Sequence, residues 1–312
     1  MTPSRRFRFG VLAKRARSRG EWQGLARRVE GQGYAILLVP DHMRPQLAPL
    51  PALIGAAEAT TTLRLGTLVL NLDLRHPVTV AREALTADLL TDGRMELGIG
   101  AGWMRSDYAD TGTAWERGRQ RAERFHEAAT LVRRLTSTEE PVHSAGRFYS
   151  VEGLPGGPLG PQRPLPLLVG AGGPRMLRTA AGVADIVSLA RSMAAGPTPM
   201  DGARDATRTA TVRKVLALRE AAGPRFDELE VNILVTLCEI GPHGGGAVAR
   251  FAADHGLSER EARDTPQHLV GDTGDVVDQL YERREAYALS YVVVREEDAD
   301  VFAPVVDKLA GA

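Results

Sequence analysis

The sequence predicts a single α/β domain over residues 1–312, folded as a parallel (β/α)8 TIM barrel with insertion segments. Short apolar runs alternate with helical stretches, and no linker separates them. Several apolar runs stop at polar or glycine-rich turns, such as Asp41-His42. Because a parallel barrel gathers the carboxyl ends of its strands at one face, these turns are expected to build one pocket.

Each element in the first half of the chain has its own signal. The run at 35–39 is apolar throughout, as expected of a strand buried on both faces. Leu25 and Val29 lie one helical turn apart, and the stretch 117–135 repeats apolar residues every three or four positions. The predicted strands are 7–12, 35–39, 63–70 and 95–99, and the predicted helices are 21–31, 50–60, 78–90 and 117–135.

The second half continues the alternation with longer interruptions. Residues 141–166 are rich in glycine and proline and are predicted to be an excursion from the barrel. Residues 190–210 and 241–265 are predicted to be surface insertions or mobile lids. The remaining predicted elements are a helix at 176–182 and strands at 165–169, 184–189, 230–240 and 289–294.

Composition excludes several classes of protein. The 39 basic and 39 acidic residues cancel, which gives no electrostatic footprint for nucleic acid. No apolar run reaches the roughly 18 residues of a membrane span, and no signal peptide is visible, so we expect a cytoplasmic protein. The single cysteine, Cys238, forms no internal disulfide and is expected in a buried strand. The seven histidines lack metal-ligand spacing, so no metal site is expected.

Two glycine-rich turns indicate ligand contact. Gly98, Gly100 and Gly102 alternate at the end of the predicted strand 95–99 and just after it, and would let a ligand approach the backbone closely. A dinucleotide fingerprint is disfavoured, because Trp103 stands where a further glycine is needed. The second turn, residues 170–175, opens a helix with Pro174 in its first turn. Free backbone N–H groups there would bind an anion such as a cofactor phosphate, with Arg175 adding charge, although a plain tight turn remains the alternative.

Seven sequence segments in a fixed order carry a family resemblance: 39–42 (VPDH), 65–70 (LGTLVL), 74–77 (LRHP), 85–90 (LTADLL), 92–103 (DGRMELGIGAGW), 168–173 (LVGAGG) and 184–185 (AD). A thinner likeness covers residues 269–272 and the last strand. Taken together, these segments resemble the bacterial-luciferase-like flavin and deazaflavin oxidoreductase superfamily. Within it, the chain is most similar to actinobacterial enzymes that use the deazaflavin coenzyme F-420 (F420).

The resemblance implies roles for particular residues. It makes His42 the acid/base or substrate-orienting group and places Asp41 near the deazaflavin ring. It also implies a non-proline cis peptide between Leu68 and Val69, with Val69 behind one face of the ring. In contrast, His76 is expected to have a structural role at a helix start. The cofactor-binding residues expected on this basis are Asp41, Thr67, Leu68, Val69, Ala101, Gly102, Ser106, Gly170, Ala171, Gly172, Gly173, Pro174 and Arg175.

Two enzymatic functions stay open, and both use a small-molecule substrate. The first is F420-dependent hydride transfer, either reducing a C=C or C=N bond or oxidising an alcohol. The second is an FMN-dependent monooxygenase that receives reduced flavin from a partner reductase. Relatives that use FMN tend to carry an arginine where Ala101 stands, which favours F420. A non-catalytic relative is disfavoured because Asp41 and His42 remain. The chain has few lysines, Lys14, Lys214 and Lys308, which argues weakly against a sugar-phosphate substrate. A homodimer is possible, because relatives are commonly homodimers.

Overall fold

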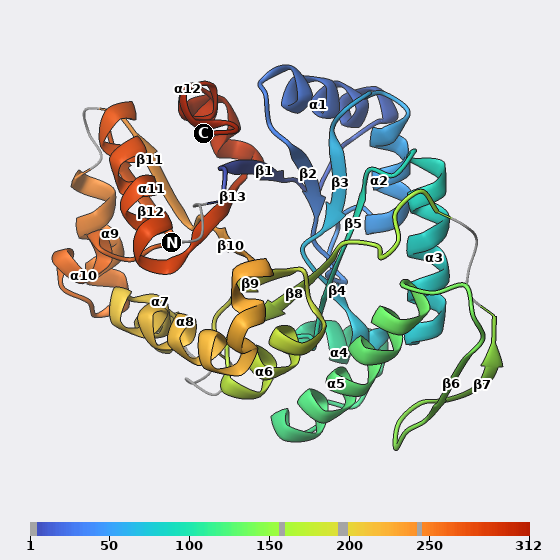
Figure 1. The fold of residues 1–312 in the computed structure, drawn as a ribbon. Coiled ribbons are helices and arrows are strands. Elements are labelled where there is room, and N and C mark those ends of the chain that lie inside the picture. Colours follow the sequence, from blue (N-terminus) through green and yellow to red (C-terminus); the bar gives the residue numbers. More distant parts are fainter. Residues whose placement is uncertain (1–4, 156–159, 193–198, 242–244) are drawn as a thin grey trace.

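The computed structural model describes residues 5–155, 160–192, 199–241 and 245–312. Its centre is a parallel sheet that closes through pairing of β3 with β5 (Figure 1). β3 and β4 are two halves of one barrel strand, so the predicted (β/α)8 TIM barrel is confirmed. Its strands are β1 (Arg8–Leu12), β2 (Ile36–Val39), β3 (Arg64–Thr67), β4 (Leu70–Asn71), β5 (Met95–Gly100), β8 (Leu167–Ala171), β9 (Ile186–Leu189), β10 (Glu230–Leu234) and β13 (Leu289–Arg295).

Helices cover the outside of the barrel, as Figure 1 shows. Their apolar side chains belong to the buried core. The side chain of His76 accepts a hydrogen bond from the Val78 N–H at the start of α3, which confirms its structural role. The helices are α1 (Arg19–Gly31), α2 (Pro49–Ala57), α3 (Pro77–Leu90), α4 (Arg105–Thr111), α5 (Gly118–Leu135), α6 (Pro174–Val183), α7 (Pro199–Ala206), α8 (Arg208–Ala222), α9 (Gly245–His255), α10 (Glu259–Arg263), α11 (Thr273–Tyr287) and α12 (Ala299–Leu309). Short 3-10 turns lie between strands and helices at η1 (Leu72–Leu74), η3 (Gly223–Glu228) and η4 (Glu296–Asp298).

The predicted strand at 230–240 is wrong in its second half. β10 ends at Leu234, where Val235 donates its N–H to the Val293 carbonyl. The chain then leaves the barrel, and β11 (Leu237–Ile240) pairs in parallel with β12 (His268–Gly271) as a separate two-stranded sheet. Cys238 therefore lies in this small sheet, half-buried and packed against the core rather than inside the barrel. Burial raises the pKa of its thiol to about 12, which keeps the thiol protonated.

The three predicted interruptions lie outside the barrel strands. Residues 141–166 carry an antiparallel hairpin, β6 (Val142–Ala145) and β7 (Ser150–Leu154), which projects from the lower right of Figure 1. The segment 190–210 contains α7, and 241–265 contains α9 and α10, which lie beside one another near β11 and β12. Parts of both segments, 193–198 and 242–244, fall outside the described residues. That either segment moves as a lid stays a prediction.

Charged side chains fill the amino-terminal end of the barrel. Glu96 of β5 is fully buried and pairs with Arg8 of β1 and, at 2.6 Å, with Arg64 of β3. Burial opposes ionisation of Glu96, yet the two guanidinium groups hold the pKa of its carboxyl below the usual value. This end is thereby closed by ion pairs, which leaves the carboxyl end of the strands for ligand binding.

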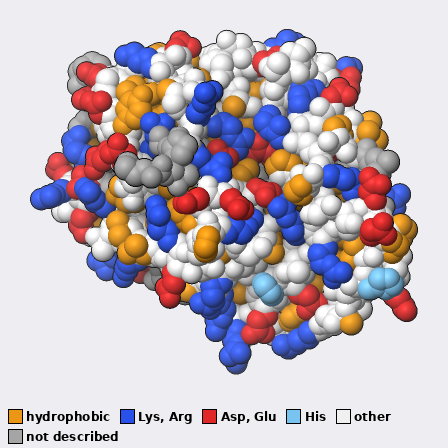
Figure 2. Space-filling view, viewed as in Figure 1, with side chains coloured by type: hydrophobic (Ala, Val, Ile, Leu, Met, Phe, Trp, Pro, Cys, Tyr) orange, Lys and Arg blue, Asp and Glu red, His pale blue; other side chains and the backbone are white. Residues whose placement is uncertain are grey.

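On the outer surface, basic and acidic side chains are interspersed over the face seen in Figure 2, in keeping with the balanced charge of the sequence. Across the described residues, no helix combines the length and apolar character needed to cross a bilayer.

Candidate active site

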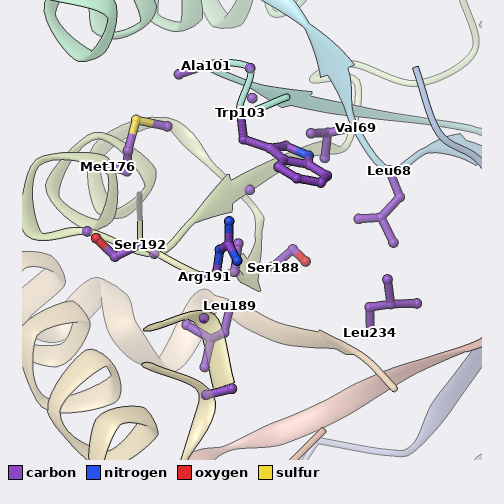
Figure 3. A pocket seen from close by; sticks show the side chains of 18 of the residues that line it. Leu68, Val69, Ala101, Trp103, Met176, Ser188, Leu189, Arg191, Ser192 and Leu234 are labelled. Atoms are coloured by element: carbon purple, nitrogen blue, oxygen red, sulfur yellow. The ribbon is translucent and has the colours of Figure 1, made fainter. Parts of the chain in front are cut away.

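A cavity of about 910 Å³ opens at the carboxyl ends of the barrel strands. It is lined by the turns after β2, β3, β5, β8, β9 and β10, and by residues of α5, α7 and α9. Figure 3 shows Trp103, from the end of β5, and Arg191, from the end of β9, reaching toward one another inside it. Their guanidinium carbon and indole centroid are 5.9 Å apart. The predicted common pocket therefore exists, and most of the predicted site residues line it.

His42 is held in one orientation by a buried carboxylate. Its Nδ1 lies 2.8 Å from Oδ2 of Asp107, and the other oxygen of Asp107 accepts the Met43 N–H at 3.1 Å. A carboxylate only accepts hydrogen bonds, so Nδ1 carries a proton and Nε2 is the nitrogen that can exchange one. The ring of Trp103 packs edge-on against the imidazole with centroids 5.5 Å apart. The arrangement fits a group that exchanges protons at the cavity surface.

Asp41 lines the cavity, but its carboxylate is occupied. One oxygen accepts from Nε of Arg75 at 2.9 Å and from the Asn71 N–H at 3.0 Å, and the other accepts from Nη2 of Arg75 at 2.8 Å. This bidentate pair, opposed by burial, raises the pKa of Arg75 above its usual value. Asp41 thus ties the end of β2 to β4 and to the segment after it. Its place beside a ring stays a prediction.

An apolar platform lies at the break between β3 and β4. The Leu68–Val69 peptide is cis, as the resemblance implies, and both side chains line the cavity (Figure 3). Gly100 leaves room beside Val69, because a Cβ at this position would lie 2.7 Å from its Cγ2. A flat ring could rest on such a surface, and Val69 as its support stays a prediction.

Packing within the chain requires two of the glycines at and after the end of β5, Gly98 and Gly102. That a ligand also approaches Gly100 and Gly102, which line the cavity, stays a prediction. A Cβ on Gly98 would lie 1.8 Å from the Thr67 carbonyl oxygen, and Gly98 does not line the cavity. Gly102 has φ +68°, and a Cβ there would lie 2.2 Å from the Tyr108 hydroxyl. Close approach is required here, but by the chain's own atoms, since β3 and α4 pack directly against this turn.

The turn after β8 has the features of an anion site. Gly172, Gly173, Pro174 and Arg175 line the cavity, and no side chain of the described residues caps the amino terminus of α6. Its first-turn N–H groups and positive helix end attract anions. Arg119, Arg121 and Arg191 also line the cavity. Arg121 is committed to the chain, since it pairs with Asp73 at 3.2 Å and donates to the Ala101 and Gly102 carbonyls.

Three of the predicted cofactor-binding residues are not among the lining residues: Thr67, Ser106 and Ala171. The Thr67 hydroxyl bridges to the backbone of Gly98, donating to its oxygen at 2.7 Å and accepting from its nitrogen at 2.9 Å. The Ser106 hydroxyl, on the short helix α4, is buried without a hydrogen-bond partner among the described residues. Thr67 therefore serves to join β3 to β5 rather than to line the cavity.

Asp107 is the main residue that sequence reasoning missed. It lies 65 positions from His42, on a seven-residue helix that follows the glycine turn. No spacing rule links two such positions, because only the barrel fold brings the turns after β2 and β5 together. The available signal was an acidic residue five positions after Gly102 of the predicted site. No cluster of metal-ligating side chains is found in the part of the chain that the structure describes.

A parallel barrel with one cavity at its carboxyl face, a cis Leu68–Val69 platform and an imidazole beside it defines a luciferase-like barrel. The family model for luciferase-like monooxygenases matches residues 7–289, and the chain belongs to this family.

Relatives and solved structures agree with this assignment. The chain is 37% identical over 164 residues to an F420-dependent glucose-6-phosphate dehydrogenase of Beutenbergia cavernae, covering 50% of this chain and 48% of the relative. The like-named protein of Nakamurella multipartita is 31% identical over 242 residues, or 74% of this chain and 67% of the relative. The match thus spans about half the length of the first relative.

Among solved structures, an F420-dependent secondary alcohol dehydrogenase with an F420–acetone adduct superposes with a TM-score of 0.77 at 17% identity, covering 97% of this chain and 99% of the other. A long-chain alkane monooxygenase, LadA, gives 0.74 at 14% identity, covering 97% and 91%. At these identities the likeness shows the barrel fold.

Proposed function

We propose that this protein is an F420-dependent oxidoreductase that transfers a hydride between the deazaflavin and a small organic substrate. The observation that carries the proposal is that the Leu68–Val69 platform and the His42 imidazole line one cavity. The curated relatives named as F420-dependent dehydrogenases support this choice of cofactor. When bound, F420 would accept or donate the hydride, and the protein supplies the surrounding groups.

The cavity fits the two chemically different parts of this cofactor. Leu68 and Val69 offer an apolar surface for a flat ring, whereas the turn 170–175 and Arg175 offer N–H donors and positive charge for its anionic tail. Asp41, Ala101 and Gly102 line the same cavity. This division of apolar and cationic lining is what a ring with a polyanionic tail requires.

His42 would handle the proton that accompanies hydride transfer. Asp107 fixes the proton of Nδ1, so Nε2 can accept a proton from an alcohol or deliver one to a reduced double bond. Asp107 is buried and acts through His42, as a positioning residue. Reduction of a C=C or C=N bond and oxidation of an alcohol would use the same group in opposite directions.

The lysines of this chain do not favour a sugar phosphate as the substrate. Lys214 donates to the Ala190 and Asp205 carbonyls at 2.9 and 2.8 Å and to the Asp205 carboxylate at 2.6 Å. Lys14, Lys214 and Lys308 are all missing from the described lining of the cavity. A substrate without a phosphate is therefore part of the proposal. Homodimeric assembly and a cytoplasmic location stay predictions from the sequence.

The anion site can be tested with two arginines on the same helix. Arg175 and Arg178 are both exposed on α6, but only Arg175 lines the cavity. We expect Arg175→Gln to weaken F420 binding about threefold to tenfold, the range of one exposed charge contact, and Arg178→Gln to leave it unchanged. Fluorescence titration of the purified variants with oxidised F420 measures both. Equal F420 affinities of the two variants would contradict binding of the anionic tail of F420 at this turn.

A further inference from the structure

A cluster of three aromatic rings forms part of the cavity wall outside the barrel strands. Phe251 and His255 come from α9 and His268 from β12. The Phe251 and His255 rings are stacked, with centroids 4.0 Å apart and planes at 16°. His268 meets Phe251 edge-on at 4.4 Å. We call these three residues the imidazole wall. It presents flat, mostly apolar surface to the cavity.

The two imidazoles of this wall have fixed tautomers. Nδ1 of His255 lies 2.9 Å from the Phe251 carbonyl oxygen, and Nδ1 of His268 lies 2.6 Å from the Ala262 carbonyl oxygen. Because a carbonyl oxygen can only accept, each Nδ1 must carry the proton. In the neutral ring, each Nε2 is then a hydrogen-bond acceptor.

His268 is held in its neutral form. Burial lowers the pKa of the His268 imidazole to about 4. The hydrogen bond to the Ala262 carbonyl opposes this shift, whereas the nearby Arg283 and His255 act in the same direction as burial. Arg283 is buried behind it and donates Nη2 to the His268 carbonyl oxygen at 2.5 Å. At neutral pH, His268 therefore contributes an acceptor and no charge.

The two neighbouring threonine hydroxyls add little to this set of acceptors. The Thr265 hydroxyl donates to the Glu261 carbonyl oxygen at 2.8 Å and is almost fully buried. The Thr236 hydroxyl lies 3.5 Å from the Gln267 carbonyl oxygen, which is too long to fix its proton, so the acceptors available to a ligand are the imidazole Nε2 atoms. Gln267 also lines this region and can donate through its amide. The region as a whole is richer in acceptors than in donors.

We infer that the imidazole wall binds the non-reacting part of the substrate and selects an uncharged, planar group that carries a hydroxyl or N–H donor. This inference rests on the proposed function and specifies its substrate class. A carboxylate or phosphate would bring acceptors against acceptors, which leaves desolvated groups unpaired. A cation would meet the charge of Arg283 behind His268. A flat hydroxylated molecule satisfies both the stacking surface and the Nε2 lone pairs.

Three probes of one shape test this selection in the wild-type protein without coenzyme. They are 2-naphthol, which donates a hydrogen bond, 2-methoxynaphthalene, which cannot, and 2-naphthoate, which is an anion. We expect 2-naphthol to bind about tenfold more tightly than each of the others in calorimetric titration at neutral pH. Tighter or equal binding of 2-naphthoate, or binding of none of the three, would overturn the inference.

Single-residue variants test which imidazoles of the imidazole wall bind 2-naphthol. His255→Phe and His268→Phe keep a ring but remove the acceptor, so each should weaken 2-naphthol binding about fivefold to tenfold and leave 2-methoxynaphthalene unchanged. Arg250→Gln, at an exposed position of α9, is the control and should change neither. Unchanged 2-naphthol binding in folded His255→Phe would contradict the inference. If His268→Phe fails to fold, His255→Phe and the wild-type ranking still decide.

Titration of the same preparations with F420 separates this inference from the proposed function. F420 binding without a preference for 2-naphthol would overturn the inference alone. A preference for 2-naphthol without F420 binding would overturn the proposed function and leave the donor selectivity of the wall in place.

Discussion

Replacing His42 with alanine is expected to lower kcat by about 10²- to 10⁴-fold while F420 still binds with wild-type affinity. The side chain lies at the cavity surface with Nδ1 bound to Asp107, so its loss removes the proton-exchanging Nε2 and little else. Steady-state turnover under argon, followed by the deazaflavin absorbance, measures the rate. A separate fluorescence titration measures the affinity.

The Asp107→Asn variant tests whether Asp107 acts by orienting His42 and not by touching the substrate. An amide can donate to Nδ1 of His42, which would move the ring proton to Nε2 and present the wrong tautomer. We expect kcat to fall and its pH profile to shift, with KM nearly unchanged. His143→Ala, at an exposed position of β6, is the control and should retain full activity. Wild-type turnover in His42→Ala would show that another group moves the proton.

Gly98→Ala is expected to destabilise the protein by about 3 kcal/mol or more, at the upper end of overpacking costs. The added Cβ would lie 1.8 Å from the Thr67 carbonyl oxygen, and a backbone atom paired into the same sheet cannot move aside cheaply. The free energy of unfolding from urea titration measures the effect. The barrel should lose stability whether or not a cofactor is present.

Gly24→Ala is the matched control for Gly98→Ala. Gly24 lies inside α1, and a Cβ added there would meet no heavy atom of the described residues within 4 Å. Alanine should therefore stabilise the helix by about 0.5–1 kcal/mol. A Gly98→Ala protein of normal stability that fails to bind F420 would contradict this account. In that case Gly98 would serve the ligand, as the sequence motif first suggested.

The barrel strands were predictable because a strand buried on both faces must be apolar along its whole length, as at 36–39. The same rule fails at 230–240. This run is apolar enough for one long strand, but the chain turns away after Leu234 and pairs β11 with β12. Strand pairing depends on partners distant in the sequence, here His268–Gly271. The amino-acid composition of residues 230–240 does not identify these partners.

The site was predictable to the extent that the fold brings strand ends together. His42, Val69 and Arg175 line one cavity although long stretches of chain separate them. Roles that depend on side-chain partners were not predictable. Asp107 is recognised only by its contact with His42, and the acceptor character of His255 follows only from the carbonyl that its Nδ1 meets.

The glycine turn illustrates the same limit. Alternate glycines indicate close approach to the backbone, but the sequence does not say what approaches. At Gly98 it is the Thr67 carbonyl, and at Gly102 the Tyr108 hydroxyl and Asn71. Both are demands of packing, and they shape the floor on which a ligand would rest.

The most direct measurement is a parallel titration of the purified apo protein with oxidised F420 and with FMN, followed by quenching of intrinsic fluorescence. Trp103 lines the cavity and is 48% exposed, so a ring bound there would quench its emission. The predicted result is micromolar or tighter binding of F420, on the order of −8 kcal/mol, and weak binding of FMN. Tight binding of FMN with weak binding of F420 would contradict it and point to a monooxygenase supplied by a flavin reductase.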